Sequence, residues 1–114
     1  MRIAWIDHAL CKIERWCLEE VFQREFDLEL VSESSWARFE EEHGPVESYD
    51  GLLIHPGLKN QVNAIERIRG LKIPVAFVTG SPQQYDSGEM HVLSYFDKES
   101  IVEYFRQTQI PKNQ

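Results

Sequence analysis

The residues best suited to chemistry in this chain come directly after short apolar runs. They are Asp7, His8, His55, Thr79 and, after the last run, Lys98. A carboxylate beside two imidazoles offers oxygen and nitrogen ligands for a transition metal such as Zn²⁺, and an imidazole can accept a phosphoryl group. The same groups can instead form hydrogen bonds and ion pairs with one another. We expect this last arrangement, in which His55 hydrogen-bonds Asp7 and Lys98 balances its charge in a fixed polar cluster.

Five short apolar runs alternate with helical stretches, and this alternation predicts a parallel sheet with helices on both faces. Residues 2–6 are apolar after Arg2, and 52–54 and 75–78 are wholly apolar, as is typical of central strands. Residues 27–31 alternate as an edge strand does, and 91–96 is the last strand. The predicted fold is α/β, a flavodoxin-like (βα)5 three-layer sandwich with sheet order 2-1-3-4-5. Its crevice lies at the carboxyl ends of the first and third strands.

The helices are predicted from apolar periodicity and from their ends. Residues 10–26 form an amphipathic helix whose stripe includes Ile13 and Cys17, with Trp16 packed near it. A short acidic helix ends before Gly44, a third helix closes at Gly70, and the last spans 101–109 behind a capping box of Ser100 and Glu103. Residues 81–90 are polar, so we expect the fourth of the five helices to be missing or short. The domain is predicted to span 1–109, with 110–114 as a tail or the start of a linker.

Charge and composition exclude several classes of function. The formal net charge is -7, and residues 25–50 hold nine acids and one arginine, which leaves no basic patch for nucleic acid. No apolar run is long enough for a membrane span. Cys11 and Cys17 are interpreted as reduced packing residues of a cytoplasmic protein. The acidic stretch either keeps the chain soluble or docks a basic partner.

Residues at the predicted crevice resemble those of the receiver domain of two-component response regulators. The resemblance covers nearly the whole chain. It includes an acid after the first strand, a Thr and a small residue after the fourth, and an aromatic three residues before a Lys in the fifth. The matching residues are Asp7, Asp50, Thr79 with Gly80, Tyr95 and Lys98, and His8 and His55 occupy the remaining positions of the site.

Two departures from that family concern its chemistry. His55 stands where the resemblance places the phosphoacceptor Asp, and His8 stands for one carboxylate of the acidic pair. Phosphoryl transfer in the family needs that Asp and a Mg²⁺ ion, which prefers hard oxygen ligands. We therefore expect a degenerate receiver site with no catalytic residue, cofactor or metal.

The resemblance then implies a signalling module that acts through a protein partner, a signalling kinase or an output protein, without phosphorylation. Trp36 and Phe39, with Trp36 partly exposed, are the candidate partner contacts, and Tyr95 is a switch aromatic or a static edge residue. Two alternatives stay open. One is a switch with an unusual phosphoryl or metal site at Asp7, His8 and His55, and the other is a small enzyme of another flavodoxin-like family.

Overall fold

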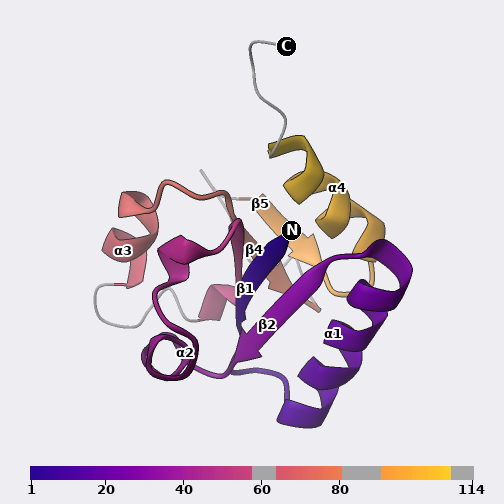
Figure 1. Ribbon diagram of the computed structural model, residues 1–114, viewed down its shortest axis with the longest axis horizontal. Coiled ribbons are helices and arrows are strands. Elements are labelled where there is room, and N and C mark those ends of the chain that lie inside the picture. Colours follow the sequence, from indigo (N-terminus) through magenta and orange to yellow (C-terminus); the bar gives the residue numbers. More distant parts are fainter. Residues whose placement is uncertain (58–63, 81–90, 109–114) are drawn as a thin grey trace.

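The computed structural model describes residues 1–57, 64–80 and 91–108. At its centre is a five-stranded parallel sheet in the order β2-β1-β3-β4-β5, which confirms the predicted strand order (Figure 1). The strands are β1 (Arg2–Ile6), β2 (Glu29–Glu33), β3 (Gly51–Ile54), β4 (Val75–Thr79) and β5 (His91–Ser94).

Helices cover both faces of this sheet, α1 and α4 on one and α2 and α3 on the other (Figure 1). The three layers confirm the flavodoxin-like α/β architecture. The predicted lack of a full helix between β4 and β5 concerns residues 81–90, which lie outside the described residues. The helices are α1 (Lys12–Phe26), α2 (Trp36–His43), the 3₁₀ helix η1 (Val46–Ser48), α3 (Ala64–Gly70) and α4 (Lys98–Thr108).

The core lies in two layers because successive side chains of a strand point to opposite faces. Trp5 of β1 packs toward α1 and α4 with Phe22 and Phe105, whereas Ile6 packs toward α2 with Phe39. All five side chains are at most 6% exposed. Within the described ranges, no helix is long and apolar enough to cross a membrane.

Helix α1 buries a different face from the predicted one. Arg15 and Phe22 are buried, whereas Ile13 is 69% exposed, Trp16 is 54% exposed and both cysteines are exposed. The expectation that Trp16 and the cysteines pack in the core is therefore wrong. Arg15 faces inward because its guanidinium bonds to carbonyl oxygens of the loop after β1, and this contact rotates the helix away from the Ile13 stripe.

Helix α2 begins and ends as predicted but is packed more deeply. The Ser35 side chain accepts a hydrogen bond from the Arg38 amide, and Gly44 ends the helix with φ of 87°. Trp36 is 6% exposed and Phe39 is fully buried. The expected exposure of Trp36 is wrong because both rings are needed to cover this face of the sheet.

Two element boundaries also differ from the prediction. Asp27 takes a left-handed φ of 52° and ends α1, so β2 starts two residues later than expected. Asp97 caps α4, since its carboxylate accepts bonds from the Ser100 amide and hydroxyl. The capping box of Ser100 and Glu103 is therefore wrong, and the helix starts at Lys98.

Gly51 is the glycine on which the packing of α4 depends. A Cβ atom there would lie 2.5 Å from the Phe105 ring and 3.0 Å from Ile3. We expect Gly51→Ala to lower the free energy of unfolding by about 1–3 kcal/mol, because the core cannot absorb an extra methyl group without strain.

The matched control is Gly70→Ala, where a Cβ atom would meet nothing within 4 Å. This substitution should leave stability unchanged or raise it by up to about 1 kcal/mol. Urea unfolding of both variants measures the difference, and equal effects would contradict the close approach of Phe105.

Candidate functional site

The predicted site residues of the first, third and fourth strands lie at the carboxyl ends of three adjacent strands. Asp7 is fully buried, His55 is 8% exposed and Thr79 is 3% exposed. His55 continues from β3, and its amide donates to the Ile6 carbonyl of β1 over 3.0 Å. Asp50, which also belongs to the receiver resemblance, lies directly before β3, where its carboxylate accepts a hydrogen bond from the Arg2 amide.

The Asp7 carboxylate is satisfied inside the protein. Its Oδ1 accepts a 2.8 Å hydrogen bond from the Ala9 amide, and its Oδ2 accepts a short hydrogen bond from the Tyr95 hydroxyl. The Ala9 contact is an Asx turn, which fixes the loop after β1. The carboxylate is thus tied both to its own loop and to the segment after β5.

Tyr95, whose hydroxyl reaches Asp7, follows directly after β5, which ends at Ser94, two residues earlier than predicted. The Tyr95 amide donates to the Thr79 carbonyl over 3.2 Å, and its ring lies 6.3 Å from that of Trp5. Lys98, placed by α4, forms no ion pair within the described part of the chain. The expected Asp7–Lys98 pair is therefore wrong, and the Tyr95 hydroxyl occupies that position.

The two histidines face each other beside Asp7. Their rings are 5.1 Å apart and at right angles, and Nδ1 of His55 accepts from the Gly57 amide over 3.0 Å. Burial lowers the pKa of His55 below its ordinary value of 6.5; Asp7 acts in the opposite direction and His8 adds to the lowering. His55 is therefore neutral at pH 7, and the Gly57 bond places its proton on Nε2.

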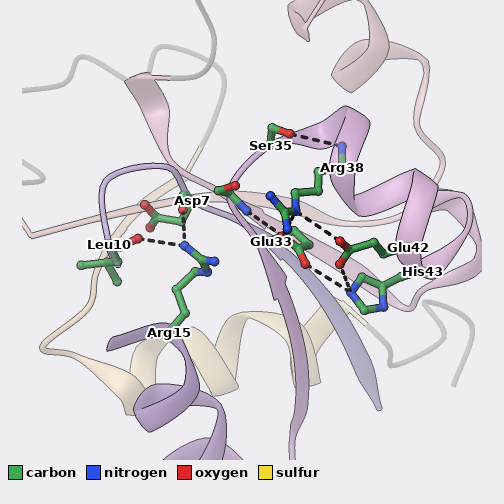
Figure 2. A network of polar contacts seen from close by, with 9 residues as sticks. Asp7, Leu10, Arg15, Glu33, Ser35, Arg38, Glu42 and His43 are labelled. Atoms are coloured by element: carbon green, nitrogen blue, oxygen red, sulfur yellow. Dashed lines mark hydrogen bonds and ion pairs between the residues drawn. The ribbon is translucent and has the colours of Figure 1, made fainter. Parts of the chain in front are cut away.

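Arg15 of α1 hydrogen-bonds to the loop that carries Asp7, a role that the sequence analysis did not find. Its Nη1 donates to the Leu10 carbonyl over 2.8 Å and to the Asp7 carbonyl over 3.4 Å (Figure 2). The side chain is 6% exposed, and its Nε has no hydrogen-bond partner among the residues that the structure describes. The available signal was its spacing of three and seven residues from Leu18 and Phe22, which places a cation on an apolar face.

A second polar group lies at the end of β2. Ligand atoms of Glu33, Glu42 and His43 lie within 4.8 Å of one another. Arg38 Nε lies 3.5 Å from Glu33 and 3.2 Å from Glu42, and His43 Nε2 lies 3.8 Å from each carboxylate (Figure 2). The Arg38 contacts are ion pairs that join β2 to α2, and the His43 ring lies beside the same two carboxylates.

The geometry limits what the crevice can bind. Among the described residues, only the group at the end of β2 brings three metal-ligand side chains so close together, so Asp7, His8 and His55 do not form a three-ligand site. Of these three side chains, Asp7 is the one that offers oxygen ligands for Mg²⁺, and its carboxylate already accepts two hydrogen bonds. The crevice is a polar cluster in which Asp7, His55 and Arg15 are hydrogen-bonded to neighbouring groups of the protein.

Comparisons of the chain with protein-family profiles, with curated proteins and with solved structures gave no match.

The Tyr95 hydroxyl should contribute measurably to stability. We expect Tyr95→Phe to lower the free energy of unfolding by about 1.5–3 kcal/mol, because a buried carboxylate loses a charge-assisted hydrogen bond. The matched control is Tyr104→Phe, which removes a 2.8 Å bond to the neutral Val75 carbonyl and should cost about 0.5–1.5 kcal/mol. Chemical unfolding at pH 7 compares the two variants. A smaller loss of stability in Tyr95→Phe than in Tyr104→Phe would contradict the hydrogen bond between Tyr95 and Asp7.

The lowered pKa of His55 predicts a specific pH dependence. Below about pH 6.5 the unfolded chain binds a proton that His55 in the folded chain resists. The contribution of His55 to stability should therefore be fully present above pH 6.5. The free energy of unfolding should fall as the pH drops from 6.5 toward the pKa of His55 in the folded chain. NMR titration of the His55 ring should give a midpoint below 6.5 that rises in His8→Gln, since the coulombic effect of His8 that lowers the pKa of His55 is removed. A midpoint at or above 6.5 in the unaltered chain would contradict it.

Proposed function

We propose that this chain is an atypical receiver-like signalling module that works without phosphorylation, through contact with a protein partner. The partner class is a signalling kinase or an output protein, as the receiver resemblance implies. The observation that carries the proposal is the state of Asp7, which is fully buried and hydrogen-bonded to Tyr95 and Ala9. A carboxylate held in this way supports a fixed conformation rather than a metal-dependent switch.

The acceptor position supports the same conclusion. In-line transfer of a phosphoryl group needs a nucleophile with an available lone pair and charge-neutralising groups around the phosphate. His55 replaces the Asp of the receiver resemblance. Its Nδ1 lone pair is engaged by the Gly57 amide and its Nε2 carries the proton. Neither nitrogen presents an available lone pair to a phosphodonor.

A cytoplasmic location belongs to this proposal. Cys11 and Cys17 are both exposed thiols, which suits a reducing compartment. The receiver resemblance also places the chain beside cytoplasmic signalling proteins.

The proposal predicts that the chain takes up no phosphoryl group. Incubation with acetyl phosphate and Mg²⁺ should leave the intact mass unchanged, and beryllofluoride should leave the backbone NMR spectrum unchanged. His55→Asp alone should not restore uptake to the level of a receiver domain, because His8 leaves the acidic pair one carboxylate short. A mass increase of one phosphoryl group that disappears in His55→Ala would refute the proposal and favour a histidine-based switch.

A further inference from the structure

Helix α1 presents an apolar face to solvent. Trp16 is 54% exposed and Ile13 is 69% exposed, and the Lys12 ammonium lies 4.7 Å from the centre of the Trp16 ring. The core is complete without these side chains, since the opposite face of α1 packs on the sheet. An exposed tryptophan beside a cation is a typical anchor of protein recognition surfaces.

A groove runs from this face to the end of α2. Its volume is about 290 Å³, and it is lined by Lys12, Trp16 and Glu19 of α1, by residues of β2, and by Glu42 and His43 of α2. Pockets for whole small molecules span about 300–1,000 Å³, so this groove lies at or below the lower limit for a metabolite. It suits a few side chains of a larger partner.

The floor of the groove is the open edge of the sheet. β2 pairs with β1 on one side, where the Glu29 amide donates to Met1 and the Glu33 carbonyl accepts from Asp7. In a parallel strand, alternate residues direct their backbone N–H and C=O groups to opposite sides. The backbone groups of Leu30 and Ser32 therefore point away from β1 and toward the groove. No described strand pairs with β2 on that side.

One backbone group on this edge already has a partner from the protein itself. The Ser32 amide donates to Glu19 Oε1 over 2.8 Å. A charged side chain at an edge is a common protection against uncontrolled strand pairing. An incoming strand can replace this contact with its own carbonyl, which exchanges one hydrogen bond for another.

Charge decides between the possible occupants. Three carboxylates, those of Glu19, Glu33 and Glu42, line the groove against the single ammonium of Lys12, and residues 25–50 carry net -8. A second copy of the chain would bring the same acidic stretch against itself, and like charges in apposition are unfavourable. A basic segment is attracted by the same field.

We propose that the open edge of β2 is a docking site for an extended, lysine- or arginine-bearing segment of a partner protein, which adds to the sheet beside β2 and packs an apolar side chain on Trp16. Main-chain hydrogen bonds then supply binding and the flanking side chains supply selectivity. This inference rests on the proposed protein-binding function and names the surface and the chemistry of its partner.

The test uses the full chain and a ten-residue blocked peptide that alternates lysine and valine. Backbone NMR should show shifts at Leu30 and Ser32, and tryptophan emission should change, because Trp16 is exposed whereas Trp5 and Trp36 are buried. We expect this peptide to bind at least tenfold more tightly than one that alternates glutamate and valine. N-methylation of one alternate set of its amides should abolish binding, whereas methylation of the other set should not.

Variants of the chain locate the site. Trp16→Ala should weaken binding at least fivefold with an unchanged unfolding midpoint, because the ring lies outside the core. Glu42→Gln should weaken binding, and the matched control Glu41→Gln, exposed on the same helix but outside the groove, should not.

Several results would overturn the docking site. They are equal binding of the two peptides, tolerance of both N-methylated sets, shifts confined to other elements, or a dimer in sedimentation that requires Trp16, which would make a second copy the occupant. Phosphoryl uptake with intact peptide binding would refute the proposed function alone. Absence of both uptake and peptide binding would refute the docking site alone.

Discussion

A carboxylate removed from water must find its hydrogen bonds inside the protein, and Asp7 imposes this requirement on one end of the sheet. Its side chain accepts from Tyr95 and Ala9, its amide donates to the Glu33 carbonyl, and its carbonyl accepts from Arg15. A single residue thus ties β1 to β2, to α1 and to the segment after β5. The arrangement of the crevice follows from satisfying this one buried charge.

Glu33 extends this dependence to the groove. Its carbonyl bonds to the Asp7 amide, and its side chain pairs with Arg38 and His43 of α2 (Figure 2). The last residue of β2 therefore belongs to both regions. The edge strand is held at its end by β1 on one side and by α2 on one face, which keeps its open backbone groups in a fixed orientation.

The strand order was predictable, and with it the placement of Asp7, His55 and Thr79 at the carboxyl ends of adjacent parallel strands. The buried face of α1 was not. Apolar residues lie all round this helix, and a charged residue, Arg15, takes an inward position because loop carbonyls receive it. The periodicity of apolar residues does not reveal a contact between a charged side chain and loop carbonyls.

The partner of Asp7 was also missed, and for a different reason. The sequence placed the end of the fifth strand at residue 96, whereas β5 ends at Ser94. Tyr95 lies just after the strand and donates its hydroxyl to the carboxylate, and Lys98 lies in the first turn of α4. Site residues can be located from topology, but their pairing depends on boundaries that local sequence does not determine.

The crevice and the groove differ in what a ligand must displace. A group that binds Asp7 in place of Tyr95 must offset a hydrogen bond to a charged acceptor, about 1.5–3 kcal/mol, which corresponds to roughly 10- to 150-fold in affinity. At the groove an incoming strand exchanges the Glu19–Ser32 contact for an equivalent bond and covers a tryptophan ring that is half in water. Burial of that ring is favourable in proportion to its apolar area. The energetic balance therefore favours association at the edge of β2 and opposes it at the crevice.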